Sequence, residues 1–117
     1  HHPPATRPPP TQVHSGWLKK KKAEKGVFGG RSTKRCYFVL YENRELHYFE
    51  GASIENLVRK GSIRVSQASA IRREKPLDRK DFTFKILVPG RDWILDPGDQ
   101  ATFDAWQEHL TPMLRAD

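Results

Sequence analysis

The sequence predicts one mostly β domain of seven short antiparallel strands followed by a single C-terminal helix. Two observations lead to this fold class. Runs rich in Val, Ile, Tyr, Phe and Trp, separated by short turn signals, fill most of the chain, whereas apolar residues at helical spacing appear only near its end. Strands and helices therefore do not alternate, which argues against a parallel α/β sheet. A length of 117 residues gives room for one domain and one core.

The first two expected strands, 15–22 and 34–41, form a hairpin around a long break. Both runs are dense in β-forming residues, and the break contains Gly29 and Gly30. Further strands are expected over 45–50, 61–65, 68–73, 81–88 and 91–95. The aromatic residues expected in the core are Trp17, Phe38, Phe82, Phe84, Trp93, Phe103 and Trp106.

The C-terminal helix is expected to begin near Asp96. Asp96 followed by Pro97 is typical of an N-cap and a first helical position, and Asp99 then places an acid in the first turn. The apolar residues that follow at helical spacing are Phe103, Trp106, Leu110 and Met113 or Leu114. Pro112 should end or kink this helix.

Residues 1–14 are Pro-rich and polar, so we expect a disordered or polyproline-like linker ahead of a folded domain over 15–115. The sequence contains no apolar run of the roughly 18 residues that span a bilayer and no signal-peptide pattern. Its single cysteine, Cys36, cannot form an internal disulfide. These features predict a cytoplasmic, reducing location.

Basic residues gather in the first hairpin. The whole chain has a formal net charge of +7, which favours phosphate-bearing partners. The basic residues of the hairpin are Lys19, Lys20, Lys21, Lys22, Lys25, Arg31, Lys34 and Arg35. Val27 and Phe28 form an apolar point between them, with Glu24 as the one acid nearby. This hairpin is therefore suited to contact an anionic surface.

Several short motifs, taken in order, resemble the pleckstrin homology (PH) domain family. The motifs are Gly16-Trp17-Leu18-Lys19-Lys20, Lys34-Arg35-Cys36-Tyr37-Phe38-Val39-Leu40, Leu46-His47-Tyr48-Phe49, Gly61-Ser62-Ile63 and Phe103-Asp104-Ala105-Trp106. The resemblance covers about residues 15–114. It implies a seven-stranded bent antiparallel barrel or sandwich capped by the helix, and a peripheral role at membranes.

Phosphoinositide-binding members of that family carry a lysine late in the first strand and a basic triplet at the start of the second. By position, Lys20 matches that lysine and Lys34 opens the triplet, but Cys36 stands where the triplet closes with arginine. A thiol offers neither the charge nor the planar donors of arginine. In addition, His47 stands where tight binders often carry a tyrosine. The resemblance therefore implies a simpler anionic lipid than a polyphosphorylated inositol.

Phosphatidic acid is the favoured lipid, followed by phosphatidylserine or a phosphoinositide, because an accessible phosphomonoester carries more charge than a phosphodiester. The lysine run with Val27 and Phe28 is also similar to that of acylated PH-domain proteins of apicomplexan parasites, which implies the same lipid. The residues expected to bind lipid phosphate are Lys20, Lys22, Lys25, Arg31, Lys34, Arg35 and Lys60, with Arg59 nearby. Val27 and Phe28 are expected to insert into the membrane. A second contact, matching the family's atypical site, would use Arg72, Arg73, Arg79 and Lys80.

Two other function classes compete with membrane binding. A PH scaffold that docks a protein partner is the first alternative, since a fold does not fix a function. The second is nucleic-acid binding, which rests on charge and on an echo of the RNA-recognition motif in residues 38–41. That fold needs two helices, and one is apparent. No catalytic motif is recognised, and we expect no enzyme, no cofactor, no metal site, no nucleic acid and a monomer.

Overall fold

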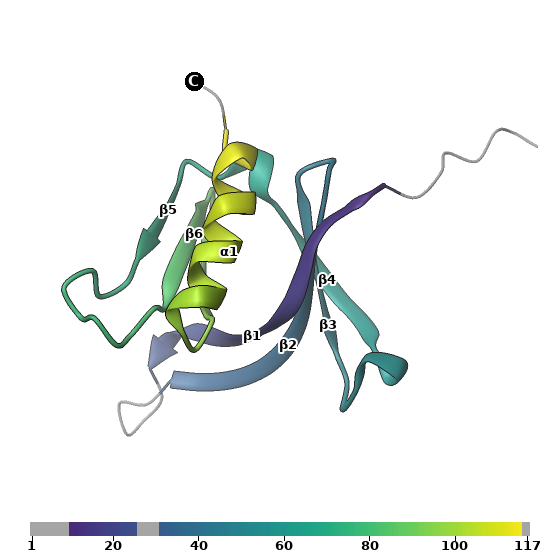
Figure 1. Cartoon of the computed structure of the whole chain (residues 1–117), viewed down its shortest axis with the longest axis horizontal. Coiled ribbons are helices and arrows are strands. Elements are labelled where there is room, and N and C mark those ends of the chain that lie inside the picture. Colours follow the sequence, from purple (N-terminus) through teal and green to yellow (C-terminus); the bar gives the residue numbers. More distant parts are fainter. Residues whose placement is uncertain (1–9, 26–30, 116–117) are drawn as a thin grey trace, which may run out of the picture.

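The computed structural model describes residues 10–25 and 31–115 and shows one bent antiparallel sheet with a C-terminal helix packed against it (Figure 1). The described strands are β1 (Gln12–Lys25), β2 (Arg31–Tyr41), β3 (Glu45–Glu50), β4 (Val58–Arg64), β5 (Ala70–Arg73), β6 (Phe84–Val88) and β7 (Arg91–Asp96). The helix is α1 (Gln100–Leu110), and the 3-10 turns are η1 (Ile54–Asn56), η2 (Val65–Gln67) and η3 (Thr111–Met113). The order of the seven strands is β4-β3-β2-β1-β7-β6-β5. This confirms the predicted fold class.

Strand β1 joins the two halves of the sheet. On one side it pairs with β2, from Gln12 opposite Tyr41 to Lys25 opposite Arg31. On its other side it pairs with β7 through three residues, 19–21. Figure 1 shows β1 and β2 curving strongly along their length. The short β1–β7 ladder therefore lies where the two halves of the bent sheet meet.

The core fills the concave side of the sheet beneath α1. The fully buried side chains include Leu18 of β1, Phe38 and Leu40 of β2, and Trp106 and Leu110 of α1. The apolar face predicted for the helix is confirmed, because Phe103, Met113 and Leu114 also pack against this cluster. Two of the aromatic residues expected in the core, Trp17 and Phe82, are only half-buried and lie outside it.

The chain enters the sheet earlier than the composition suggested. Strand β1 begins at Gln12, within the segment expected to be linker. Val13 packs against the core, and the ring of His14 lies edge-on to Trp106 with 4.5 Å between ring centroids. These contacts give residues 12–14 the buried apolar surface that the Pro-rich sequence before them lacks.

The expected start of the helix is wrong by three residues. Asp99, not Asp96, is the N-cap, and its carboxylate accepts a hydrogen bond from Thr102 N at 2.7 Å. Asp96 instead closes a turn by accepting from Gly98 N at 2.9 Å, and Gly98 has a positive φ of 89°. Pro97 therefore precedes the helix.

Four further expected strands also have different starts. Strands β2 and β4 begin three residues earlier than predicted, at Arg31 and Val58, and β5 begins two residues later, at Ala70. Strand β6 begins at Phe84, because Asp81 accepts a hydrogen bond from Thr83 N and so holds a turn ahead of the strand.

Candidate functional site

Basic side chains from three strands surround one depression of about 140 Å³ at the end of the β1–β2 hairpin. The residues that line it are Lys20, Lys21 and Lys22 of β1, Ser32 and Lys34 of β2, and Arg91 of β7. None of these lining residues is acidic. The depression therefore has the charge and the donors that an anionic group requires.

Aromatic rings lie beneath two of these cations. The Lys20 Nζ atom is 4.9 Å from the centroid of the Tyr48 ring and 5.9 Å from that of Trp93. The guanidinium carbon of Arg91 lies 3.6 Å from the Trp93 ring centroid. Such cation–π contacts are attractive because the face of an aromatic ring has a negative electrostatic potential. They hold both charges over the depression without neutralising them.

Lys34 stands directly opposite Lys20 in the β1–β2 ladder. Its Nζ atom lies 3.1 Å from Glu50 Oε1 at the end of β3. The Lys34 side chain is 61% exposed, so this ion pair stays in contact with water and is weak. A ligand phosphate would compete with Glu50 for the Lys34 ammonium group.

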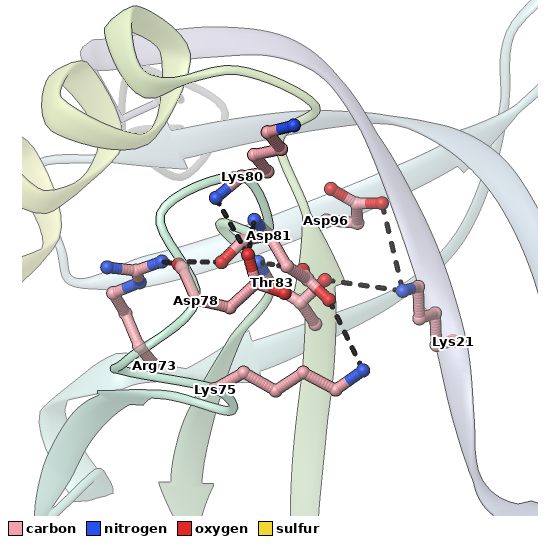
Figure 2. A network of polar contacts seen from close by, with 8 residues as sticks. All are labelled: Lys21, Arg73, Lys75, Asp78, Lys80, Asp81, Thr83 and Asp96. Atoms are coloured by element: carbon pink, nitrogen blue, oxygen red, sulfur yellow. Dashed lines mark hydrogen bonds and ion pairs between the residues drawn. The ribbon is translucent and has the colours of Figure 1, made fainter.

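Lys21 is committed elsewhere, although it lines the same depression. Its ammonium group donates to Thr83 Oγ1 at 3.2 Å and lies 3.7 Å from Asp96 Oδ2 (Figure 2). Hydrogen bonds from Thr83 in turn hold the pKa of Asp81 below its ordinary value. Lys21 therefore connects β1 to β7 and to the turn before β6. Its ammonium group has a structural role and is less available to a ligand than that of Lys20.

Cys36 lies on the same inward face of β2 as Lys34 and is completely buried. Burial raises the pKa of its thiol, an effect that the charge of Lys20 opposes. The thiol is therefore neutral at physiological pH and presents nothing to the depression. Cys36 therefore offers the depression no charge and no strong hydrogen-bond donor.

Arg35 points away from the depression. Its guanidinium carbon lies 3.9 Å from the centroid of the Trp17 ring, on the other face of the sheet. There it lines a separate hollow with Lys19 and Asp96. Because successive residues of a strand face opposite sides, Arg35 cannot join Lys34.

The other predicted phosphate ligands are dispersed. Lys60 is exposed on β4 and does not line the depression, while neighbouring Arg59 donates from Nε to His47 Nδ1 at 3.2 Å. Lys25 and Arg31 end β1 and begin β2, with their side chains outside the description. The expected insertion residues Val27 and Phe28 also lie outside the described residues.

Sequence reasoning missed Arg91. It is the first residue of β7, directly after the Pro89-Gly90 turn. Because β7 runs antiparallel to β1, its first residues approach the end of the hairpin, beyond the paired Lys21 and Ile94. The sequence predicts the strand that begins at Arg91 but not its pairing with the first strand, and it is this pairing that brings Arg91 to the lysines.

One of the four residues of the second expected contact, Arg73, is held by internal bonds. One terminal nitrogen of Arg73 donates to the carbonyl oxygens of Asp78 and Asp81 (Figure 2). Its guanidinium carbon also lies 4.8 Å from the Phe82 ring centroid. Arg73 therefore shapes the β5–β6 loop. Arg72, Arg79 and Lys80 are exposed around it.

Comparison with known proteins identifies the family. The PH domain family matches residues 12–115, so this chain belongs to the PH domain family. The solved structure of the PH domain of human pleckstrin homology domain-containing protein family A member 5 superposes with a TM-score of 0.68 at 19% identity, covering 100% of this chain and 89% of that one. The Slm1 PH domain in complex with phosphoserine gives a TM-score of 0.59 at 21% identity, covering 85% of this chain and 91% of that one.

A curated relative extends far beyond this domain. A putative leucine-rich repeat-containing protein of Dictyostelium discoideum is 31% identical over 108 residues, which are 86% of this chain but 7% of that protein. The chain thus spans a small part of the relative that it matches. In the described part of the chain, no helix is long and apolar enough to cross a membrane, and no group of three His, Cys, Asp or Glu side chains could hold a metal ion.

Proposed function

We propose that this PH domain is a peripheral membrane module that binds the head group of an anionic phospholipid in the depression between β1, β2 and β7. One observation carries the proposal: Lys20, Lys22, Lys34 and Arg91 converge there, with no acid among the lining residues. The net charge of +7 supports attraction to an anionic leaflet. Binding would take place on the cytosolic face of a membrane.

The chemistry of the depression favours a single phosphate. A volume of about 140 Å³ is small for a polyphosphorylated ring. Three of the four cations are lysines, which act as point charges, and the arginine fork that would grip a second phosphate is replaced by buried Cys36. The phosphoserine in the Slm1 PH structure is a phosphomonoester as well. Phosphatidic acid is the first choice, and phosphatidylserine or a monophosphoinositide the second.

The expected affinity is modest. Each Lys or Arg close to an anionic surface contributes about 1 kcal/mol, so four cations give weak to moderate attachment. Lys25 and Arg31 would add to the attraction from the end of the hairpin. The apolar pair Val27 and Phe28 remains the proposed insertion tip, and Phe28→Ser should weaken vesicle binding but not the binding of a soluble head group.

The test removes two cations from the depression and compares the result with the loss of two cations elsewhere. Lys20→Ala with Lys34→Ala should weaken binding to vesicles containing phosphatidic acid by about thirtyfold, because two cations at about 1 kcal/mol each contribute about 2 kcal/mol. The matched control, Lys19→Ala with Arg72→Ala, removes the same charge from exposed positions outside the depression. Co-sedimentation measures both. Equal losses would reduce the site to general electrostatics, and a larger loss in the control would move it to the other face.

Docking of a protein partner is the alternative for a domain of this family. The same depression would then bind a phosphorylated or acidic side chain. Failure of the unmodified domain to bind any anionic vesicle, with retained affinity for a phosphoserine peptide, would favour this alternative.

A further inference from the structure

We infer that the connection between β3 and β4 is a membrane-inserting element, with Ile54 and Val58 as the side chains that enter the bilayer. This inference rests on the proposed function, because it supplies the apolar contact that would accompany head-group binding. It adds a second insertion element to the proposed tip at Val27 and Phe28, and this element consists of described residues that the sequence analysis did not single out.

The apolar side chains of this connection are exposed without a packing role. Ile54 is 62% exposed and Val58 is 59% exposed, and η1 contains no buried residue. Among the described residues, the other large hydrophobic side chain with high exposure is Leu77, at 96%. Two of the three exposed large apolar residues in the described structure therefore lie within five positions of each other.

The connection is continuous with the basic depression. Lys34, which lines the depression, is bonded to Glu50, and Glu50 stands directly opposite Val58 in the β3–β4 ladder. Residues opposite each other in an antiparallel pair project from the same face of the sheet. Val58 therefore projects on the side of the sheet from which the Glu50 carboxylate reaches the depression. In Figure 1 the β3–β4 connection and the hairpin end of β1 and β2 both lie in the lower part of the view, at opposite sides of it.

The charged residues beside the exposed apolar side chains of this connection are of the kind that contacts a lipid head-group layer. Arg59 and Lys60 directly follow Val58 and are both exposed, while Glu55 is the acid of η1. Long basic side chains beside apolar ones place their charge in the head-group layer while the apolar groups go deeper.

The backbone of this connection is already ordered, so insertion would cost little conformational entropy. Asn56 N donates to Ser53 O at 3.1 Å, and a Cβ at Gly51 would lie only 2.4 Å from Asn56 O. The backbone of 51–56 thus packs on itself and presents Ile54 outward. An apolar group that is presented in advance loses less free energy to ordering when it binds.

Insertion can be measured directly with an environment-sensitive fluorophore on an introduced thiol. Ile54→Cys is the test position and Leu77→Cys the control, and the native Cys36 is completely buried and should escape labelling. Figure 1 places the β5–β6 loop, which holds Leu77, on the opposite side of the view from η1. On phosphatidylcholine vesicles containing phosphatidic acid, the label at 54 should shift to the blue and be quenched by acyl-brominated lipid. The label at 77 should do neither.

A second measurement uses the unlabelled protein. Ile54→Ser with Val58→Thr should lower partition onto the same vesicles by about tenfold, because both replacements bury less apolar surface in the bilayer. Binding of soluble glycerol 3-phosphate, followed by NMR, should not change, and Leu77→Ser should behave as the unmodified protein.

The outcomes separate this inference from the proposed function. If the label at 54 stays in water while the protein sediments with vesicles, or if the double variant partitions normally, the inference is overturned and the basic site stands. An equal loss of vesicle and glycerol 3-phosphate binding would also overturn it, because the residues would then act on the site. Failure of the unmodified domain to bind vesicles would overturn both.

Discussion

At the residue scale, Lys34 and Cys36 show how neighbouring inward positions of one strand take different roles. Cys36 lies deep enough to be completely buried, whereas the Lys34 side chain is 61% exposed. A charge at the deeper position would lose its hydration, while a charge at the outer one keeps it. Glu50 is therefore the group that pairs with Lys34, and we predict that this pairing lowers the affinity of the depression for a phosphate.

Removing the Glu50 charge should strengthen binding. Glu50→Gln releases the Lys34 ammonium group from its carboxylate, and an exposed ion pair of this kind is worth about 0.2–1 kcal/mol. Vesicle affinity should rise by about two- to fivefold, as measured by co-sedimentation. Glu108→Gln, which removes an exposed acid on α1, is the control with the same change of net charge. Equal gains in both variants would argue against a specific role for Glu50.

At the element scale, the pairing of β1 with β7 determines which aspartate caps the helix and which residues lie at the depression, and the local sequence determines neither. Asp96 and Asp99 are both acceptable N-caps by residue type, but Lys19 stands opposite Asp96 in the ladder, which keeps Asp96 in the sheet. The strand pattern predicted the elements and the buried face of the helix. It could not predict contacts between distant strands, and so it missed Arg91 and the commitment of Lys21 to Thr83 and Asp96.

The close packing of the β3–β4 connection makes Gly51 irreplaceable. A Cβ there would lie 2.4 Å from Asn56 O and 3.0 Å from its carbonyl carbon, and both are main-chain atoms. Gly51→Ala should lower the free energy of unfolding by about 1–3 kcal/mol in urea denaturation. Gly16→Ala is the control, because its Cβ would lie 3.8 Å from the Trp106 ring, an ordinary contact. Comparable stability of the two variants would show that the turn adapts.

The contact between β1 and α1 should make stability depend on pH. The ring of His14 stacks on His109 with 4.6 Å between centroids, and burial lowers the pKa of His14, with the nearby His109 adding to this effect and Glu108 opposing it. A histidine with a lowered pKa in the folded state binds its proton more weakly than the unfolded chain does. Its stabilising contribution is therefore present above its ordinary pKa of 6.5 and is lost as the pH falls below that value.

Urea denaturation at a series of pH values tests this expectation. The free energy of unfolding should fall as the pH drops below 6.5, and His14→Gln should flatten the decline. Measurements should stay well above the range in which Asp81 and Asp99 titrate, since hydrogen bonds lower the pKa of both carboxyls below 3.8. An unchanged slope in His14→Gln would assign the decline to other groups.

At the scale of the whole molecule, the basic surface is a product of the bend in the sheet. The sequence indicated that lysines gather on the first hairpin, and Lys20, Lys22 and Lys34 do line one depression. The alternation of side chains along a strand already predicts that Arg35 faces away from Lys34, and the structure places it against the Trp17 ring on the other side of the sheet. The exposure of Ile54 and Val58 could not be predicted, because it depends on which surfaces the rest of the fold covers.

The central claim is that the depression recognises a phosphate head group and is more than a positive patch. Co-sedimentation with neutral vesicles doped with phosphatidic acid, phosphatidylserine or a phosphoinositide, at matched surface charge, tests it most directly. We predict stronger binding to phosphatidic acid than to the other lipids, and loss of that preference in Lys20→Ala with Lys34→Ala. Binding that follows surface charge alone, with the same order in the variant, would contradict a head-group site.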